Sequence, residues 1–436
     1  MQVILLSGGS GKRLWPLSND IRSKQFIKIF KNPNGGYESM LQRAFRQIKK
    51  VDANISIVVA TAKSQVSMVR NHLGAVDISA EPCRRDTFPA VALTCAYLRD
   101  VKKINPDEPI VVCPVDSYVE DKYFLLLRKM AEMVAAGNIN LALMGIKPTY
   151  PSSKYGYIIP AENNLWVFKE KPTEQIAAEY IAKGALWNGG IFAFKLGYIL
   201  DKTKSIIGKN SYAEIFAQYE TLPKISFDYA ISEKEKNIAV AIYDGEWKDS
   251  GTWNTLSEVM EIPCIGDVLT DNTCTNLNVI NETDIPLICM GLKDMIVAAG
   301  ADGILVTDKI QSAQIKSYVE QIHQPSRYAE KSWGVFKIID IEQESLTIKA
   351  DIPAGQHMRY HSHNFRAETW NIISGEGTAI VDGKKLSVRA GDVVNLPVNC
   401  RHTIIAKTNL KIIEVQLGKD ITIDDKIIYD FPEGVN

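Results

Sequence analysis

The chain has 436 residues, which is enough for two or three domains because single hydrophobic cores stop growing well below that length. Its 50 basic and 51 acidic side chains nearly cancel, and no run of like charge stands out, which excludes a broad surface for nucleic acid or for an anionic membrane. The seven cysteines are scattered without a CxxC pair, which argues against a disulfide framework or a zinc ribbon.

The first elements along the chain are a short apolar run and a glycine-rich turn. The run is too short for a signal peptide or a membrane span, so we expect a cytoplasmic protein. Similar β-branched runs then alternate with helical stretches, which predicts βαβ units on a largely parallel sheet. Ligands bind beyond the carboxyl ends of such strands. The predicted strands are residues 3–6, 55–60, 110–113 and 141–146, and the predicted helices are residues 38–50 and 122–136.

The pattern of residue types changes after residue 262. Residues 263–309 contain short segments with Asn, Asp and Gly at close spacing, which predicts a small β-rich connector. Residues 309–323 have helical spacing, and the Gln-Pro-Ser break that follows marks a boundary near residue 325. Strand-like alternation with frequent turn residues then predicts a β-barrel or sandwich. The expected domains are therefore 1–262, 263–325 and 326–436.

The first predicted strand runs directly into a glycine-rich loop that can bind phosphate. Glycines let the backbone approach phosphate oxygens, and main-chain N–H groups and basic side chains meet their charge. The loop is neither a Walker loop nor a GxGxxG fingerprint. With the last residue of the strand, the candidate nucleotide-binding residues here are Leu6, Gly8, Gly9, Ser10, Gly11, Lys12 and Arg13.

The string GGSGKRLWPLS, followed by Ser23-Lys24-Gln25-Phe26, closely resembles the signature of sugar-phosphate nucleotidyltransferases. Its Trp-Pro-Leu-Ser and Lys-Gln-Phe residues resemble those of the mannose-1-phosphate guanylyltransferases in particular. The resemblance covers roughly residues 1–325. It implies a Rossmann-like, GT-A-like mixed sheet and transfer of a nucleotidyl group from GTP to mannose 1-phosphate, and we expect a homodimer. It continues in order through Glu81-Pro82, Pro114-Val115-Asp116, Tyr155-Gly156-Tyr157-Ile158, Phe168-Lys169-Glu170-Lys171-Pro172, Trp187-Asn188-Gly189-Gly190, Ser226-Phe227-Asp228-Tyr229-Ala230 and Asp249-Ser250-Gly251-Thr252-Trp253.

The residue types in these motifs suit this chemistry. Attack of a sugar phosphate on the α-phosphorus of a triphosphate joins two polyanions, so catalysis is mostly charge neutralisation and in-line positioning. Mg²⁺ prefers carboxylates together with phosphate oxygens and water. Asp116 and Asp249 each follow a strand-like run and match the metal-binding aspartates of the family. We therefore expect these two carboxylates to hold Mg²⁺.

The resemblance also implies which cations and polar groups contact the substrates. Arg13 and Lys24 are expected on the triphosphate, and Lys171 on the sugar 1-phosphate. Glu170 is expected to bind sugar hydroxyls, with Gly156 and Asn188 as further sugar contacts. We interpret Trp187 as a packing residue.

The base-binding segment of the family corresponds to Glu81 with Thr87 and Pro89. A carboxylate suits the N1–H and N2–H₂ donors of guanine, and a base without those donors would leave the acceptor unpaired. The family usually has Asn where this chain has Asp86 and Ala where it has Phe88, so contacts near the ribose or base are expected to differ.

The C-terminal segment contains histidines at the spacing of a cupin. Gly355, His361, His363, Glu368 and Gly375 fit the first cupin motif position by position, and Gly391, Pro397 and His402 fit most of the second. Residues two apart on a strand point to one face, and a barrel brings neighbouring strands to it. Three imidazoles and a carboxylate suit Zn²⁺, Mn²⁺, Fe²⁺ or Ni²⁺. The expected ligands are therefore His361, His363, Glu368 and His402.

This barrel resembles the type II mannose-6-phosphate isomerase domain that is often fused behind the guanylyltransferase. The resemblance would make the chain bifunctional, with metal-assisted proton transfer between fructose 6-phosphate and mannose 6-phosphate. His361, Phe365 and Thr369 replace residues of the isomerase pattern, which typically reads Gln-x-His-x-His-Arg-x-Glu-His-Trp. An active isomerase and a regulatory or structural barrel both stay open.

Two other functions compete with the guanylyltransferase interpretation. The chain could transfer a different nucleotide or use a different sugar 1-phosphate, which a substrate panel would detect. It could also be a non-catalytic sugar-nucleotide sensor, which could lose Asp116, Asp249 or Lys171 without penalty. All three residues are present.

Overall fold

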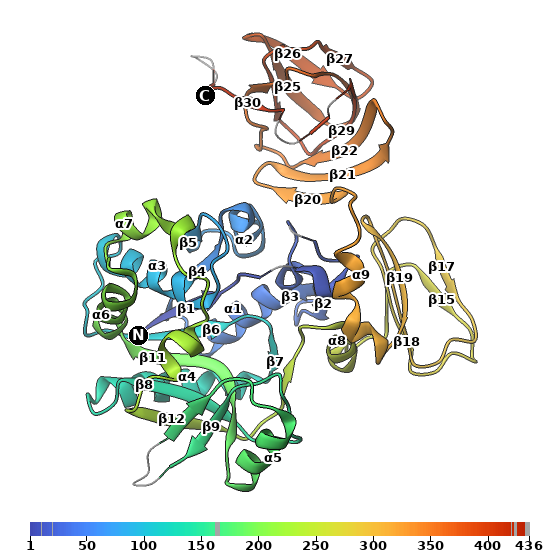
Figure 1. Cartoon of the computed structure of the whole chain (residues 1–436). Coiled ribbons are helices and arrows are strands. Elements are labelled where there is room, and N and C mark those ends of the chain that lie inside the picture. Colours follow the sequence, from blue (N-terminus) through green and yellow to red (C-terminus); the bar gives the residue numbers. More distant parts are fainter. Residues whose placement is uncertain (10, 20, 162–165, 420, 423–424, 432–436) are drawn as a thin grey trace. The chain divides into compact units, whose positions relative to one another are not determined.

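The computed structural model describes residues 1–436 except 10, 20, 162–165, 420, 423–424 and 432–436 (Figure 1). The chain forms two compact units. The first contains Met1–Leu14, Ser23–Pro263 and Thr307–Ile315, and the second contains Trp15–Arg22, Cys264–Val306 and Lys316–Asn436. The predicted three-domain division, with boundaries after residues 262 and 325, stays a prediction.

The first unit is built on a mixed sheet with nine strands among the described residues. β1 pairs in parallel with β4 and β6, and β4 with β5, which is the predicted βαβ part. β11 runs antiparallel to β6, β8 and β9, and β12 is parallel to β8. The predicted α/β class is confirmed. The bounds are β1 (Gln2–Leu6), β4 (Ser56–Ala62), β5 (Asp77–Glu81), β6 (Pro109–Pro114), β8 (Leu141–Ile146), β9 (Tyr157–Pro160), β10 (Trp166–Lys169), β11 (Leu186–Lys195) and β12 (Ile238–Tyr243).

Helices cover both faces of this sheet, which explains why its central strand is a continuous apolar run. Val3, Ile4 and Leu5 of β1 are each 0% exposed. On the face of Ile4 lie α3 (Thr87–Asp100), α6 (Leu196–Ile207) and α7 (Tyr212–Ala217) (Figure 1). On the other face α4 (Asp121–Ala135) contacts β6, β8, β11 and β12 and packs against α1 (Met40–Val51). Both predicted helices, at 38–50 and 122–136, are confirmed as α1 and α4.

The connector of the second unit consists of short strands, most of which pair in parallel. β14, β16 and β18 pair in parallel, as do β15 and β17. The predicted β-rich connector is therefore confirmed. The helix predicted over residues 309–323 is reduced to the 3-10 turn η7 (Gln311–Gln314) and the short α9 (Lys316–Val319). The strands are β14 (Cys264–Ile265), β15 (Val268–Thr270), β16 (Asn278–Asn281), β17 (Leu287–Cys289), β18 (Met295–Gly300) and β19 (Gly303–Asp308).

Trp15–Arg22, which follows the glycine-rich loop, belongs to the second unit. Arg22 forms a bidentate pair with Glu282, with N–O distances of 2.5 and 3.0 Å. Asn19 donates to Asp302 over 2.6 Å. These contacts attach the residues that directly follow the Trp-Pro-Leu-Ser part of the signature to the connector.

The C-terminal part of the second unit is a barrel of two antiparallel sheets, with Trp370, Ile372, Ile404 and Ile412 in its core. The predicted all-β barrel is confirmed. One sheet contains β20 (Tyr328–Lys331), β21 (Gly334–Ile341), β22 (Ser345–Ile352), β29 (Leu410–Gly418), β24 (Arg366–Ser374) and β27 (Val393–Leu396). The other contains β26 (Lys384–Arg389), β25 (Glu376–Val381), β28 (His402–Ala406), β23 (His361–Ser362) and β30 (Ile427–Ile428).

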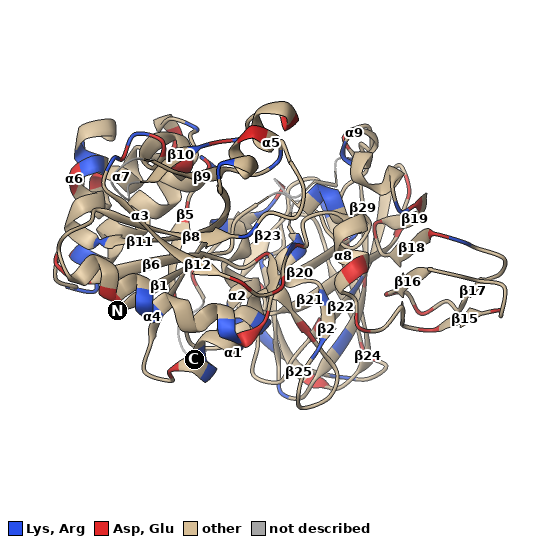
Figure 2. Cartoon of the chain, turned by 90° about the horizontal axis from the view of Figure 1, so that it is seen from below, with Lys and Arg blue, Asp and Glu red and all other residues tan. Residues whose placement is uncertain are grey.

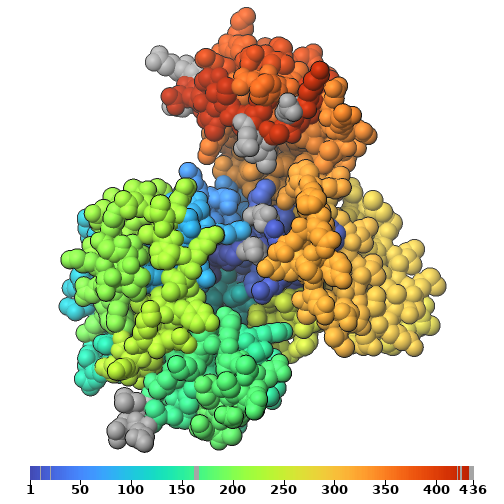
Figure 3. Space-filling model, viewed as in Figure 1, coloured from blue at the N-terminus to red at the C-terminus, as the bar shows by residue number. Residues whose placement is uncertain are grey.

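Basic and acidic residues are interspersed along both units, in keeping with the balanced composition (Figure 2). The space-filling view shows how closely segments from distant parts of residues 1–260 pack in the first unit (Figure 3). Among the described residues, no helix combines the length and the apolar character that crossing a bilayer requires.

Candidate active site and candidate metal centre

The glycine-rich loop follows β1 and is hydrogen-bonded to β4 and to Ser23. The Ser7 N–H donates to the Ala60 carbonyl over 2.9 Å, and the Gly9 carbonyl accepts from the Ser23 hydroxyl over 2.8 Å. Gly9 has φ of 127°, a conformation that favours glycine. Gly8 and Gly9 are exposed, so their backbone is accessible to a ligand. Of the predicted loop residues, Ser10 lies outside the described residues.

Asp116 and Asp249 lie close together at the ends of paired strands. Asp116 follows β6 and precedes β7 (Ser117–Val119), which pairs with β13 (Trp247–Asp249) so that Asp249 lies opposite Ser117. The Ser250 N–H also donates to the Asp116 carbonyl over 3.4 Å. The pairing of two short strands thus brings together carboxylates that are far apart in the sequence.

Lys24 forms an ion pair with Asp116 and lies near Asp249. Its ammonium is 2.7 Å from Asp116 Oδ2. A Cβ atom added to Gly251 would lie 2.8 Å from Asp249 Oδ1 and 3.0 Å from Lys24 Nζ, so these two groups share the space beside Gly251. The Gly251 N–H donates to Asp249 Oδ1 over 2.9 Å. Gly251 therefore leaves room for charged groups that a larger residue would displace.

The electrostatics of this group are those of a cation site. The ammonium of Lys24 lowers the pKa of Asp116, although burial works in the opposite direction. Burial raises the pKa of Asp249; Lys24 opposes this effect and Asp116 adds to it. Arg13 lowers the pKa of both carboxylates. Two hard-oxygen ligands that repel each other and attract nearby cations fit a divalent ion such as Mg²⁺.

The predicted sugar-phosphate residues form a second group in the first unit. Lys171 Nζ is 2.6 Å from Glu170 Oε1, directly after β10. The Asn188 N–H donates to the Gly156 carbonyl over 2.8 Å. A Cβ atom on Gly156 would lie 2.6 Å from Glu170 Oε2 and 2.6 Å from Phe168 Cζ. Gly156 thus connects Glu170 with Asn188, and only glycine fits there. Trp187 is 4% exposed and donates to the Tyr157 hydroxyl over 3.0 Å, as expected of a packing residue.

The candidate base-binding residue Glu81 ends β5 beside the glycine-rich loop. It is 6% exposed, and Tyr219 donates to its Oε2 over 2.7 Å. The other oxygen, Oε1, would lie 3.6 Å from a Cβ atom on Gly8, so it faces the loop. Burial raises the pKa of Glu81, and the Tyr219 hydroxyl opposes this effect. One carboxylate oxygen thus lies on the loop side, and the nearby Arg84 also lowers the pKa of this group.

The two departures from the family near Glu81 have structural roles. Asp86 has φ of 70° and ψ of −177°, a strained conformation that is otherwise almost confined to glycine, and its carboxylate accepts from the Thr87 N–H over 2.7 Å at the start of α3. Phe88 is 0% exposed in the core, and Pro89 is also buried. The Thr87 hydroxyl accepts from the Phe227 N–H over 2.8 Å. The Phe88 difference therefore concerns packing beneath the site.

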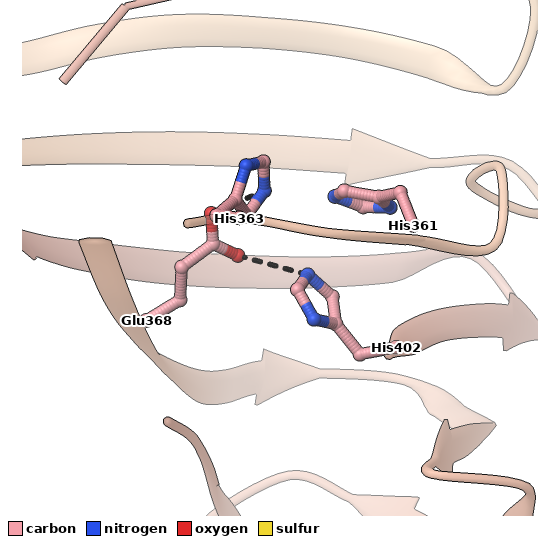
Figure 4. A group of neighbouring side chains, drawn as sticks. All are labelled: His361, His363, Glu368 and His402. Carbon is pink, nitrogen blue, oxygen red and sulfur yellow. Dashed lines mark ion pairs between the residues drawn. The ribbon is translucent and has the colours of Figure 1, made fainter. Parts of the chain in front are cut away.

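The four predicted metal ligands of the barrel come together in its interior (Figure 4). Their ligand atoms all lie within 4.8 Å of one another, and each residue is buried. His361 of β23 lies opposite His402 of β28. Glu368 of β24 lies 3.0 Å from His363 Nε2 and 3.3 Å from His402 Nε2. The group is the one that the cupin spacing predicts, and it could hold a metal ion.

Backbone carbonyls orient all three imidazoles of this centre. His361 Nδ1 lies 2.6 Å from the Arg359 carbonyl, His402 Nδ1 lies 3.0 Å from the Cys400 carbonyl, and His363 Nδ1 contacts the Asp425 carbonyl. Carbonyls only accept hydrogen bonds, so each Nδ1 carries the proton and each Nε2 keeps its lone pair. The Nε2 lone pair of His363 accepts from Arg366 Nη2 over 3.2 Å. Burial lowers the pKa of His361 to about 2, which keeps this imidazole neutral. The donor set therefore fits a borderline divalent metal.

Comparisons with known proteins agree with this arrangement. Residues 2–263 match the family described as "Nucleotidyl transferase", which is more than half of the chain. The chain belongs to the nucleotidyl transferase family. Residues 318–430 match the family described as "Mannose-6-phosphate isomerase C-terminal".

Curated relatives of this nucleotidyl transferase align with it over nearly the full length of both chains. A mannose-1-phosphate guanylyltransferase of Salmonella montevideo is 28% identical over 99% of this chain and 99% of its own length. A mannose-1-phosphate guanylyltransferase of Escherichia coli K12 is 26% identical over 97% of this chain and 96% of its own length. A crystal structure named mannose-1-phosphate geranyltransferase, from Thermus thermophilus, covers 74% of this chain and 99% of its own, with a TM-score of 0.61 and 27% identity.

Sequence reasoning assigned no role to several residues beside the two sites of this nucleotidyl transferase. In the barrel, Arg366 Nε and Gln416 Nε2 donate to Glu368 Oε1 over 3.1 and 3.3 Å. In the first unit, Asn188 Nδ2 donates to Asp228 over 3.0 Å. Asp228 lies within a motif quoted for the family resemblance, but only the long-range fold reveals its partner.

Changing Gly156 to Ala is expected to raise the KM of the nucleotidyl transferase for its sugar 1-phosphate about tenfold or more. The added methyl group would meet Glu170 Oε2 and the Phe168 ring, and Glu170 would have to move. The exposed Ser153→Ala change in the same loop is the control. Steady-state kinetics with varied sugar phosphate give the answer, and an unchanged KM would show that Glu170 does not contact the sugar.

Proposed function

We propose that the chain is a mannose-1-phosphate guanylyltransferase, which converts GTP and mannose 1-phosphate into GDP-mannose and pyrophosphate. The observation that carries the proposal is the convergence of Asp116, Asp249 and Lys24 at paired strand ends. A group of two carboxylates and cations is what two mutually repelling phosphates need in order to react. The full-length relatives with this activity support the choice of substrates.

Each residue of the site then has a role in the transfer. The backbone of Gly8, Gly9, Ser10 and Gly11 and the side chains of Lys12 and Arg13 bind the triphosphate, beside Leu6. Lys24 neutralises charge next to the α-phosphorus, and Lys171 holds the sugar 1-phosphate for in-line attack. Glu170, Gly156 and Asn188 orient the sugar ring. Mg²⁺ held by Asp116 and Asp249 would supply further neutralisation of the phosphate oxygens.

We assign guanine as the base because of Glu81, which lies in the same segment as Thr87 and Pro89. Only Glu81 Oε1 faces the loop, because Tyr219 engages Oε2. A single charged acceptor for the guanine N1–H or N2–H₂ donors would reject adenine, which lacks them.

Glu81→Gln is expected to lower kcat/KM for GTP by roughly 10- to 100-fold, because a charge-assisted hydrogen bond to the base is lost. Activity with ATP should change much less, so the preference for GTP should fall. Glu220→Gln, at an exposed site, is the control. An unchanged GTP-to-ATP preference would remove Glu81 from base recognition.

A pyrophosphate-release assay tests the proposed activity directly. GTP, ATP, UTP and dTTP are each paired with mannose 1-phosphate and with glucose 1-phosphate. The proposal expects the highest kcat/KM for GTP with mannose 1-phosphate. Preference for another pair would favour the alternative that the chain serves a different nucleotide sugar, and no release with any pair would favour a sugar-nucleotide sensor.

A second candidate function belongs to the barrel. The group of His361, His363, Glu368 and His402 favours binding of Zn²⁺, Mn²⁺, Fe²⁺ or Ni²⁺ and, with it, interconversion of fructose 6-phosphate and mannose 6-phosphate. Phe365, which is 60% exposed, and Thr369 stand where the isomerase pattern has histidines, which favours a regulatory or structural barrel instead. Incubating the metal-loaded protein with fructose 6-phosphate and assaying mannose 6-phosphate distinguishes the two.

The organisation of the molecule is part of the same proposal. We assign the transferase to residues 1–262, the connector to 263–325 and the cupin to 326–436, and we expect a cytoplasmic homodimer. The extents of the two family matches, 2–263 and 318–430, support these boundaries. Sedimentation velocity tests the dimer.

A further inference from the structure

Asp228 begins a wide turn that lies between the two candidate substrate sites. Asp228–Ser232 forms a π-helical turn, η6, a rare conformation that often marks functional sites. The residue before it, Phe227, is 0% exposed and donates its N–H to the Thr87 hydroxyl over 2.8 Å. The turn is therefore anchored to the start of α3, in the segment assigned to the base.

The carboxylate of Asp228 fixes the amide of Asn188. Asn188 Nδ2 donates to Asp228 Oδ1 over 3.0 Å, and Asn188 Oδ1 accepts from the Gly190 N–H over 3.1 Å. A backbone N–H can only donate, so the oxygen and nitrogen of this amide cannot exchange places. Asp228 accepts from one of the two amide N–H groups, and no described residue accepts from the other.

Asp228 also lies beside the other sugar residues. Burial and the nearby Glu170 raise the pKa of Asp228 to about 7, and Lys171 opposes this. Glu170 in turn lies against Gly156, whose carbonyl accepts from the Asn188 N–H. A buried carboxylate next to a second carboxylate is costly unless it has a defined partner, and here that partner is Asn188.

We propose that Asp228 is a positioning residue for the hexose 1-phosphate, which holds the Asn188 amide toward the sugar hydroxyls. The π-helical turn connects Asn188, through Asp228, with Thr87, through Phe227. The segments assigned to the sugar and to the nucleotide are therefore both hydrogen-bonded to this turn. The inference rests on the proposed function, because it assumes that Asn188 contacts the sugar. Asp228 itself acts through Asn188 and takes no part in the transfer.

Kinetics of three full-length variants test this role. Asp228→Ala leaves Asn188 without its acceptor and is expected to raise the KM for mannose 1-phosphate about tenfold, with the KM for GTP within about twofold. Asp228→Asn keeps an amide oxygen as acceptor and is expected to stay within about threefold of the wild-type KM. Asp201→Ala, at an exposed position on α6, should have no effect.

A double-mutant cycle separates positioning from a general structural role. In an Asn188→Ala background, Asp228→Ala should add less than about twofold to the KM, because the residue through which it acts is gone. Equal rises in the KM for both substrates, full additivity with Asn188→Ala, or an Asp228→Asn variant as impaired as Asp228→Ala would overturn the proposal. If Asp228→Ala does not fold, Asp228→Ser replaces it, since a serine hydroxyl is too short to hold the amide.

The wild-type protein separates this inference from the proposed function. If it uses a different triphosphate or sugar phosphate, the guanylyltransferase assignment fails and the same KM comparison proceeds with the preferred pair. If it shows no turnover, calorimetric binding of mannose 1-phosphate takes the place of the KM, and unchanged affinity in Asp228→Ala overturns the inference. Active wild type with an unchanged Asp228→Ala KM overturns the inference alone.

Discussion

Replacing Asp249 by Asn is expected to lower kcat for nucleotidyl transfer by roughly 100- to 1,000-fold while the protein remains folded. The amide has nearly the shape of the carboxylate, and its oxygen can still accept from the Gly251 N–H. The negative charge beside Lys24 and Asp116 is lost, and with it one hard-oxygen ligand for a divalent ion. The damage should therefore appear in turnover and in the Mg²⁺ concentration needed for half-maximal rate.

The stability of this variant should not fall. Burial raises the pKa of Asp249, so its charged form is less stable in the folded protein than in the unfolded chain. That cost is absent below the unfolded pKa, grows as the pH rises from the unfolded to the folded pKa, and stays constant above it. A neutral amide removes this cost. Thermal melting at pH 7 should thus give an equal or higher Tm. Asp244→Asn, an exposed change after β12, is the control, and near-normal turnover of Asp249→Asn would exclude Asp249 from the cation site.

Replacing His361 by Ala is expected to weaken metal binding by the barrel about 100-fold or more. The change removes one of four preoriented ligands, and losses of up to this size follow even from disturbing residues behind the ligands. His357→Ala is a matched control, because His357 is exposed and its Nδ1 lies 2.9 Å from the Met358 carbonyl. Metal content after dialysis, measured by elemental analysis, should be near one per chain in the control and near zero in His361→Ala.

Metal binding should also stabilise the wild-type barrel. An ion that binds the folded state alone adds about 2.7 kcal/mol when its concentration is 100 times the dissociation constant. Chelation should therefore lower the Tm of the wild type and of His357→Ala, but not that of His361→Ala. Equal metal content in both variants would show that the four side chains do not form the binding site.

Local sequence signals were enough to predict the central strands, two helices and the cupin ligands. β1 and β6 are apolar on both faces, which identifies them as buried parallel strands. The cupin ligands follow from strand periodicity, because His361 and His363 lie two residues apart. These features depend on neighbours in the chain, so a sequence is sufficient to find them.

Features that depend on distant partners could not be predicted. β11 joins the sheet antiparallel to β6 through residues about 80 positions away along the chain, and no local pattern encodes that pairing. Asp228 lies in a quoted motif, but its partner Asn188 is 40 positions earlier. The Trp15–Arg22 segment is held in the second unit by Glu282 and Asp302, which local periodicity does not connect to it.

The most direct test of the account is ³¹P NMR of the wild-type protein with GTP, mannose 1-phosphate and Mg²⁺. We predict that the signals of GTP and of the sugar monophosphate disappear together, and that a sugar-linked diphosphate and pyrophosphate appear in equal amounts. Adding a chelator, or replacing Asp249 by Asn, should stop the reaction. Unchanged substrates, or loss of GTP by hydrolysis with mannose 1-phosphate left intact, would contradict the claim that Asp116, Asp249 and Lys24 bring the two phosphates together.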